Sequence, residues 1–272
     1  PEQVGRAALD AGEVAVLTLA GGLGSRWTDG AGVVKPINPF IRIDGRHRSF
    51  VEIHLAKSRR TARGRRPHAH VFSTSFLTHE AIAGHLARAR NFDYPGPVHL
   101  SRASAIGHKL IPTAADLRFV WEELSRQELS PNAQRVLDDL HRTLMGWARE
   151  MGEGEDYRAN APEQRFYPPG HWYEVPNLLT NGTLARLLAD NPALRYLLVH
   201  NADTLGACLD PRLIGQHALA GRTISFEVTP RRHEDAGGGL ARVNGALQLV
   251  EGFAFPREQD EWRLSYYNTL TS

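Results

Sequence analysis

The chain has 272 residues, of which 42% are hydrophobic and 23% charged, and its formal net charge is +2. This is ordinary globular composition, and the small net charge gives no general electrostatic reason to expect nucleic acid as a partner. Cys208 is the only cysteine, which excludes a disulfide framework and a cysteine-based zinc cluster. Residues 1–13 lack the apolar core of a signal peptide, and no apolar stretch approaches the roughly 18 residues of a membrane span. The sequence therefore predicts a cytoplasmic protein that does not contact a membrane.

Strand-like and helix-like segments alternate along the first hundred residues. Short apolar, β-branched runs predict strands, and apolar residues at helical spacing predict helices. Ser49 and Glu52 have the spacing of a capping box, and Thr78 is the expected N-cap of the next helix. The predicted strands are 14–19 and 71–75, and the predicted helices are 49–61 and 78–90.

A helical hairpin is predicted in the middle of the chain. Two helices are expected between residues 114 and 151, with Ser130 and Pro131 as the N-cap and first-turn proline of the second helix. The hairpin is interpreted as an insertion of about 114–160. Residues 57–66 form a strongly basic run, for which a solvated loop is expected rather than a phosphate-binding surface.

The last third returns to alternating elements. Asp210 and Pro211 begin a helix that Gly221 ends. Strands are predicted at 195–200, 223–228 and 246–250, the last two joined by a glycine-rich connection. This alternation predicts an α/β fold with a mainly parallel sheet covered by helices, in which ligands bind at the carboxyl ends of strands.

Two polar loops follow apolar strands. The loop after Leu19 carries Gly21, Gly22 and Gly24, whose missing side chains allow backbone N–H groups to approach a phosphate. It matches neither a P-loop nor a good dinucleotide fingerprint, and alone it reads as a structural turn. The second loop carries Asp203, a carboxylate able to hold Mg²⁺ or simply to cap a turn.

Two further motifs are weak on their own. Pro168-Pro169-Gly170-His171 is a rigid turn that presents a histidine. Residues 227–232 place cations at the end of a predicted strand, before the glycines at 237–239. Taken singly, the first is a surface turn and the second a basic hairpin tip.

In this order and spacing, the motifs resemble the UTP–glucose-1-phosphate uridylyltransferase family. The family's Leu-x-Gly-Gly-x-Gly…Lys loop is similar to 19–35, its Pro-Pro-Gly-His turn to 168–171, and its Asn-x-Asp-Asn-Leu-Gly-Ala segment to 201–207, where Thr204 replaces the second Asn. Its Glu-Val-Thr…Gly-Gly stretch resembles 227–239, its Leu-Leu-Glu resembles 249–251, and its Phe-Asn-Thr-Asn resembles 267–269.

The resemblance implies a Rossmann-like nucleotide-diphospho-sugar transferase fold over a single catalytic domain, 1–272. It also implies transfer of UMP from UTP to a sugar 1-phosphate, glucose 1-phosphate by default, with Mg²⁺ as cofactor. It assigns catalysis to Lys35, Arg26 and Arg231, and the metal to Asp203. The residues that it assigns to nucleotide binding are Leu19, Ala20, Gly21, Gly22, Gly170 and Asn201. Those that it assigns to the sugar phosphate are His171, Glu251 and Asn268.

The sequence departs from the family at several positions. Trp172 stands where a glycine is usual, Arg231 replaces a lysine, and Gly237 replaces a second lysine. The chain ends at Ser272, and the resemblance implies a fragment or a truncated member without the family's C-terminal part. Two alternatives stay open: a catalytically weak relative that binds nucleotide sugars, and a dinucleotide-dependent oxidoreductase suggested by the glycine loop alone. The sequence does not determine the oligomeric state or the sugar.

Overall fold

The molecule consists of two compact units, each assembled from two stretches of the chain. The first comprises Pro1–Ile106 with Pro168–Ser225, and the second Gly107–Tyr167 with Phe226–Ser272. The computed structural model describes residues 1–22, 24, 34–107, 131–150, 166–167, 171–232, 239–250 and 263–268.

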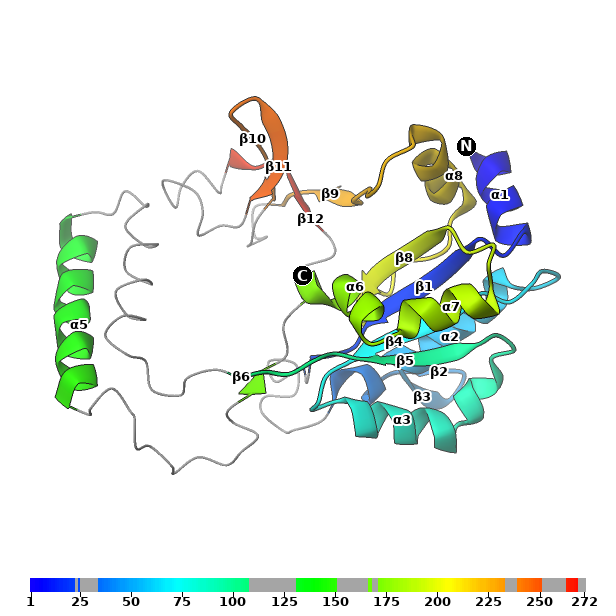
Figure 1. Cartoon of the computed structure of the whole chain (residues 1–272), viewed down its shortest axis with the longest axis horizontal. Coiled ribbons are helices and arrows are strands. Elements are labelled where there is room, and N and C mark those ends of the chain that lie inside the picture. The colour runs from blue at the N-terminus through cyan, green and yellow to red at the C-terminus, as the bar shows by residue number, and fades with distance from the viewer. Residues whose placement is uncertain are drawn as a thin grey trace. The chain divides into compact units, whose positions relative to one another are not determined.

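A four-stranded parallel sheet forms the centre of the first unit (Figure 1). The strands lie in the order β5-β4-β1-β8, and every neighbouring pair is parallel. Their bounds are Val14–Leu19 for β1, His70–Thr74 for β4, Val98–Arg102 for β5 and Tyr196–Asn201 for β8. The predicted parallel α/β fold is therefore confirmed, and β1, β4 and β8 lie within a residue of their predicted positions.

Helices cover both faces of this sheet because its strands are apolar on both faces. All six residues of β1 are buried, as expected of a central parallel strand. Val51 and Leu55 of α2 pack in one core with Phe72, and Leu178 of α6 packs with Leu17 on the opposite face. The helices of this unit are α1 Glu2–Asp10, α2 Phe50–Thr61, α3 His79–Arg88, α6 His171–Thr180, α7 Thr183–Asp190 and α8 Pro211–Ala220.

Several helix ends follow the predicted signals. The Ser49 hydroxyl accepts a hydrogen bond from the Glu52 N–H at 3.3 Å, which caps α2. Asp210 accepts from the Arg212 N–H at 2.8 Å, and Gly221 ends α8 with a φ of 59°. Thr78 precedes α3 as predicted but does not cap it. Its hydroxyl instead donates to the Ala20 carbonyl at 3.1 Å and so ties α3 to the end of β1.

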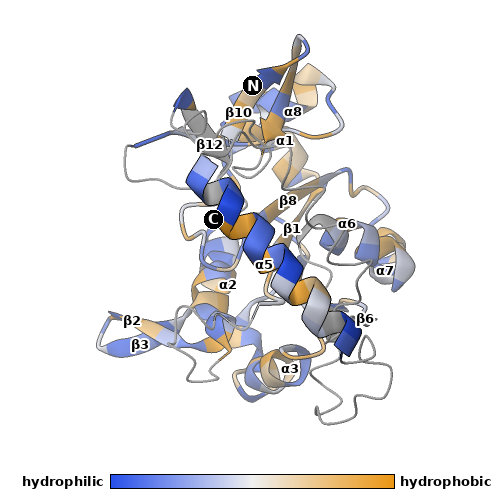
Figure 2. Cartoon of the chain, turned by 90° about the vertical axis from the view of Figure 1, so that its left-hand side faces the viewer, coloured by the Kyte–Doolittle hydropathy of each residue, from blue (hydrophilic) through white to orange (hydrophobic). Residues whose placement is uncertain are grey.

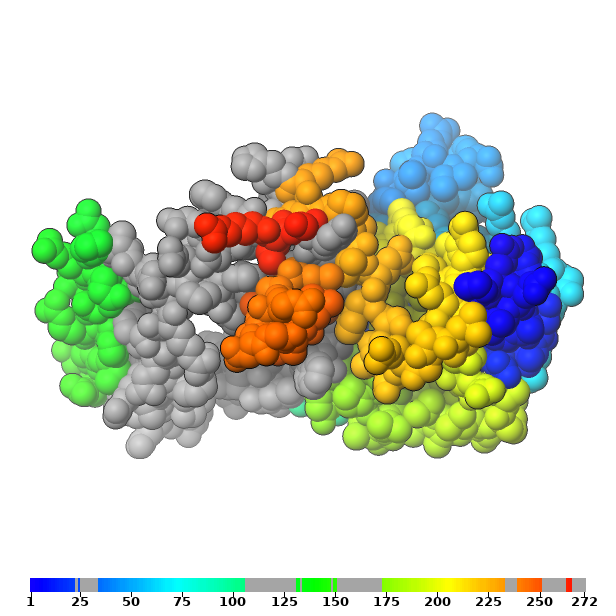
Figure 3. Space-filling model, turned by 90° about the horizontal axis from the view of Figure 1, so that it is seen from above, coloured from blue at the N-terminus to red at the C-terminus, as the bar shows by residue number. Residues whose placement is uncertain are grey.

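Helices α1 and α8 pack unusually closely, side by side on the surface of the first unit (Figure 3). A Cβ atom placed on Gly5 would lie 1.8 Å from the Pro211 carbonyl oxygen, and one on Gly215 would lie 1.8 Å from the Pro1 oxygen. Only glycine permits this approach of two backbones. The same unit contains the turns η1 Lys35–Ile37 and η2 Arg90–Asp93 and the hairpin β2 Pro39–Ile43 with β3 Arg46–Ser49.

The second unit has a four-stranded sheet in the order β11-β10-β12-β9. Its bounds are β9 Val228–Pro230, β10 Gly239–Val243, β11 Ala246–Val250 and β12 Tyr266–Asn268. The β10–β11 hairpin turns at Asn244 and Gly245, both with positive φ. The unit also contains the short strand β7 Phe166–Tyr167 and helix α5 Pro131–Glu150, along which apolar and polar residues alternate (Figure 2). The two-residue strand β6, Ile106–Gly107, falls at the point where the chain passes from the first unit to the second.

Three predictions need correction or completion here. Residues 223–227 are not in a strand, and the strand there begins only at Val228. Lys57 does not lie in a solvated basic loop, because it belongs to α2 and is partly buried. Of the predicted helical hairpin, the second helix is α5, which begins at Pro131 as expected. The first predicted helix lies outside the described residues. The single-domain boundary of 1–272 stays a prediction.

Candidate functional site

The loops that follow β1 and β8 leave the sheet next to each other at its carboxyl edge. The Ala202 N–H donates to the Leu19 carbonyl at 3.0 Å, and the Ala20 N–H donates to the Ser73 carbonyl at 2.9 Å. These bonds extend the parallel pairing past the last strand residues. The glycine loop and the Asp203 loop therefore begin at adjacent points, as the sequence predicted for this edge.

Gly21 and Gly22 differ in their surroundings. The Gly21 carbonyl accepts a hydrogen bond from the Ser75 hydroxyl at 2.7 Å, and a Cβ atom at Gly21 would lie 3.2 Å from Glu174 Oε1. Gly22 is exposed, and within the part of the chain that the structure describes a Cβ atom there would meet nothing within 4 Å. The backbone is thus anchored at Gly21 and open at Gly22, an arrangement that suits close approach of an anionic group.

Gly24 shapes the position of Lys35. Its φ is 75°, and a Cβ atom at Gly24 would lie 2.4 Å from Lys35 Cβ and 2.9 Å from Lys35 Cδ. The lysine stem therefore occupies the space that any other residue at position 24 would fill. The glycine motif thus has a second role, which is to let the side chain of Lys35 lie against the loop.

Lys35 and Asp203 form an ion pair between the ammonium group and Oδ2 of the carboxylate. Their side chains are 24% and 30% exposed, so the pair is partly accessible to solvent. Lys35 begins η1, and Asp203 lies two residues beyond the end of β8. Two residues assigned separately from the sequence, 168 positions apart, thus meet at the sheet edge.

The other nucleotide-site predictions at this edge are buried. Leu19, Ala20 and Asn201 are 7%, 1% and 4% exposed. The backbone N–H and carbonyl of Ala20 are bonded to Ser73 and Thr78, and the Leu19 carbonyl to Ala202. The side chains of these residues therefore have little surface that a ligand could contact. Their assigned roles in nucleotide binding stay predictions.

The remaining predicted residues are only partly described or lie in the other unit. His171 begins α6, and Asn268 in β12 pairs with Val228 of β9. The Arg231 N–H donates to the Ser265 carbonyl at 2.8 Å in the second unit. Three assigned residues lie outside the described part of the chain, namely Arg26, Gly170 and Glu251.

Glu174, which the sequence reading missed, lies directly beneath the glycine loop. It is in the first turn of α6, is 2% exposed, and places Oε1 against Gly21. Burial raises the pKa of its carboxyl to about 7, and the nearby Ser73 hydroxyl offsets part of that rise. The carboxyl is thus largely protonated below neutral pH. The signal in the sequence is an acidic residue three positions after the Pro-Pro-Gly-His motif, next to the apolar Val175.

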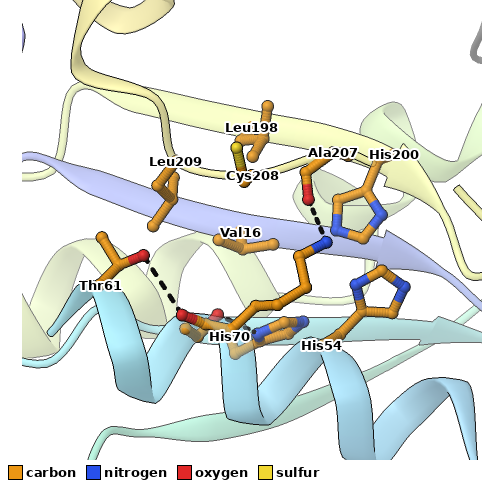
Figure 4. Close-up of a pocket in the computed structure, with 11 residues that line it drawn as sticks. Val16, His54, Thr61, His70, Leu198, His200, Ala207, Cys208 and Leu209 are labelled. Carbon is orange, nitrogen blue, oxygen red and sulfur yellow. Dashed lines mark hydrogen bonds between the residues drawn. The ribbon is translucent and has the colours of Figure 1, made fainter. Parts of the chain in front are cut away.

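A cluster of three histidines lies on the opposite face of the sheet, beneath the Asp203 loop (Figure 4). Burial lowers the pKa of His54 to about 3 and that of His200 to about 4, and it holds the pKa of His70 well below its usual range. All three rings are therefore neutral at physiological pH. The cavity beside them has a volume of about 20 Å³, enough for about one water molecule and far too small for a nucleotide.

The described residues contain no group of three or more histidine, cysteine, aspartate or glutamate side chains placed around a common metal position. Asp203 alone still suits Mg²⁺, which often takes one or two carboxylates and completes its coordination with phosphate oxygens and water. Such a metal would compete with, or share, the carboxylate now paired with Lys35. Within the same described residues, no helix is both long and apolar enough to cross a membrane.

Solved structures with this architecture are UDP-sugar pyrophosphorylases. The UDP-glucose phosphorylase of Trypanosoma brucei superposes with a TM-score of 0.63 and 21% identity, covering 97% of this chain and 49% of the other. The UDP-N-acetylglucosamine pyrophosphorylase of the same organism gives a TM-score of 0.57 and 19% identity, covering 93% and 44%. The chain therefore has the α/β fold of the nucleotidyltransferase-type pyrophosphorylases.

Sequence comparison points to one family within that class. Residues 154–269 match the family model of UTP–glucose-1-phosphate uridylyltransferase. The proteins of that name from Solanum tuberosum and Saccharomyces cerevisiae are 35% identical over 102 residues and 31% identical over 106 residues. These alignments cover 37% and 38% of this chain, and the chain spans about a fifth of the length of each relative. The resemblance to this family is therefore confirmed.

Proposed function

We propose that the chain is a nucleotidyltransferase that transfers UMP from UTP to a sugar 1-phosphate, releasing pyrophosphate. The observation that carries the proposal is the Lys35–Asp203 ion pair at the carboxyl edge of the sheet, next to the open backbone at Gly22. A cation, a carboxylate and an unobstructed glycine backbone at one edge are the parts that phosphoryl transfer requires. The family resemblance supports the same reaction.

In this reaction a phosphate oxygen of the sugar 1-phosphate attacks the α-phosphorus of UTP in line. The bond from the α-phosphorus to the oxygen that bridges the α- and β-phosphates breaks, and its electrons leave with pyrophosphate. Little covalent work falls to the protein, which positions the two substrates and neutralises charge. Backbone N–H groups near Gly22 would hold the triphosphate, and the Lys35 ammonium would offset charge on the departing pyrophosphate.

Asp203 would hold Mg²⁺ through its carboxylate. The metal, when bound, supplies charge neutralisation at the phosphates. The Lys35 ammonium, which is paired with the Asp203 carboxylate in the free protein, would lie beside this metal ligand, where it would contact a phosphate oxygen of the same nucleotide. A cytoplasmic location stays a prediction of the sequence alone.

The test is a matrix of four nucleoside triphosphates against several sugar 1-phosphates, with pyrophosphate release as the readout. Glucose, galactose and N-acetylglucosamine 1-phosphates belong in it, because the structural relatives include enzymes named for UDP-glucose and for UDP-N-acetylglucosamine. We expect release with UTP and at least one sugar. Nucleotide binding by calorimetry without release from any pair would instead favour a binding protein that lacks turnover.

A further inference from the structure

Helix α2 holds the Asp203 loop from below through two side chains one turn apart. His54 Nε2 donates to the Ala202 carbonyl at 2.7 Å, immediately before Asp203. The Lys57 ammonium donates to the Leu205 carbonyl at 2.8 Å and also to the Ala207 carbonyl, beyond Asp203. Residues three apart on a helix lie on one face, so a single helix face grips the loop on both sides of the carboxylate.

A chain of hydrogen bonds across the sheet holds the start of the same loop. His200 Nδ1 donates to the Asn201 carbonyl at 2.8 Å, so its neutral ring accepts at Nε2 from the Thr18 hydroxyl at 3.1 Å. Thr18 in turn accepts from His70 Nε2 at 2.8 Å. His70 Nδ1 then accepts from the Ser58 hydroxyl on α2 at 3.0 Å. One set of neutral tautomers satisfies every bond in the chain.

Four carbonyls between residues 201 and 207 therefore receive side-chain donors from this network. Backbone bonds within the loop run from the N–H groups of Thr204, Leu205 and Ala207 to the carbonyls of Asn201, Asp203 and Thr204. The side-chain donors add bonds to the carbonyls of Ala202, Leu205 and Ala207. His54 is 2% exposed, and Lys57 is partly buried. The adjoining cavity admits about one water molecule, so the cluster is not itself a substrate pocket.

We propose that His54 and Lys57 are positioning residues that fix the Asp203 loop and thereby place its carboxylate for Lys35 and for the metal–nucleotide complex. The inference rests on the proposed function for its catalytic consequence, but the hold on the loop is a property of the free protein. Groups that carry a metal ligand must be fixed within a fraction of an ångström by their own supporting contacts. Here the supporting contacts come from α2, almost 150 residues earlier in the chain.

The test uses two pairs of variants. Lys57→Met keeps most of the aliphatic stem and removes the ammonium donor, and Arg60→Met is its control because Arg60 is exposed on the same helix. His54→Leu removes the donor to Ala202, whereas His54→Gln retains an N–H that can reach the carbonyl. Circular dichroism melts establish which variants fold. Because Lys57 is only partly buried, Lys57→Met keeps the test available if His54→Leu does not fold.

The first readout is hydrogen exchange, by mass spectrometry, of peptides covering residues 201–207 in the free protein. We expect Lys57→Met and His54→Leu to speed exchange there about tenfold or more, because each removes hydrogen bonds to buried carbonyls. Arg60→Met should match the parent, and His54→Gln should recover most of the protection. Unchanged exchange in both Lys57→Met and His54→Leu would overturn the proposal.

The second readout is Mn²⁺ binding in the presence of UTP, followed by electron paramagnetic resonance. Lys57→Met should weaken Mn²⁺ binding about tenfold, the scale on which residues that support metal ligands act. UTP affinity measured without divalent cation should stay within about twofold of the parent. Faster loop exchange with unaltered Mn²⁺ binding overturns the positioning role. A parent that binds neither UTP nor Mn²⁺ contradicts the proposed function instead. In that case, hydrogen exchange of residues 201–207 still tests whether α2 fixes the Asp203 loop.

Discussion

The two faces of the parallel sheet support its carboxyl edge in opposite ways. On the α2 face, His54 and Lys57 donate hydrogen bonds to the Asp203 loop, and His70 and His200 are joined through the Thr18 hydroxyl beneath it. On the α6 face, beneath the glycine loop, the Glu174 carboxyl is buried beside the Ser73 hydroxyl, and its Oε2 has no hydrogen-bond partner among the described residues. The α2 side thus donates hydrogen bonds to the loop above it, whereas the α6 side buries a carboxyl that has an unpaired oxygen among the described residues.

This difference assigns separate tasks to the two sides of the sheet: one fixes the position of Asp203, and the other leaves room for the nucleotide. A satisfied buried network favours one geometry, because moving any member leaves a costly unpaired group. The Asp203 side should therefore be rigid and should govern turnover. The glycine side should adapt to the nucleotide and should govern binding. Substitutions on the two sides are expected to separate these effects.

The largest effect should come from the glycine side. Gly22→Val places a branched side chain where a Cβ atom meets no atom of the described residues within 4 Å, so folding should be intact. The same side chain would fill the space through which the triphosphate approaches the backbone. We expect UTP binding to be abolished, as calorimetry on the folded variant would show. Parent-like affinity would remove this loop from the nucleotide site.

Lys35→Ala tests the other side. Removing the ammonium group takes away charge stabilisation where pyrophosphate departs, which typically costs about 10²–10³ in kcat. UTP affinity should change much less than turnover. Pyrophosphate-release kinetics decide this, and a loss confined to KM would assign Lys35 to ground-state binding instead.

The histidine network predicts loss of stability in acid. The pKa values of His54 and His200 are lowered to about 3 and about 4, so the unfolded chain binds protons below pH 6.5 that the folded chain does not. Stability is then complete above pH 6.5 and falls as pH drops, by about 1.4 kcal/mol per pH unit for each histidine. Urea unfolding between pH 7 and 4 measures this slope. His54→Gln should flatten it, and an unchanged slope in that variant would contradict the buried neutral state.

Glu174 predicts a smaller dependence of opposite sign. Its pKa is raised from 4.5 to about 7, so its contribution to stability is complete below pH 4.5 and is lost as pH rises through 7. Glu174→Gln removes that dependence. Relative to the parent, the variant should gain stability from pH 4.5 upward, reaching about 3 kcal/mol above pH 7. Melting curves at pH 5 and pH 8 test it, and an equal difference at both pH values would count against the raised pKa.

The helices and strands that could be predicted from the sequence are those whose ends or apolar pattern are set by a few neighbouring residues. The apolar run of β1, the Ser49 cap of α2, and the Asp210 and Gly221 ends of α8 each act within a few residues. The loops that carry Lys35 and Asp203 are also predictable neighbours, because parallel strands bring their carboxyl ends together, while the roles of the two residues stay predictions. Their pairing became visible only with the adjacency of β1 and β8.

The supports beneath that edge were not predictable in this way. Thr18, His70 and His200 lie on three different strands, and they meet only because the order β4-β1-β8 and the two-residue repeat of strands place them on one face. Lys57 sits in a run of basic residues whose composition suggested solvent. Glu174 follows a proline–glycine turn that drew attention to His171 rather than to the helix after it.

The central claim is that Asp203 serves a Mg²⁺-dependent uridylyl transfer. The most direct measurement is a Mg²⁺ titration of pyrophosphate release from UTP and sugar 1-phosphate, with the parent and Asp203→Asn side by side. The asparagine keeps the shape of the side chain and removes its charge. We predict that the parent requires a divalent cation and that Asp203→Asn loses most of its turnover without losing its fold. Equal activity with the same Mg²⁺ dependence, or no release by the parent with any substrate pair, would contradict the claim.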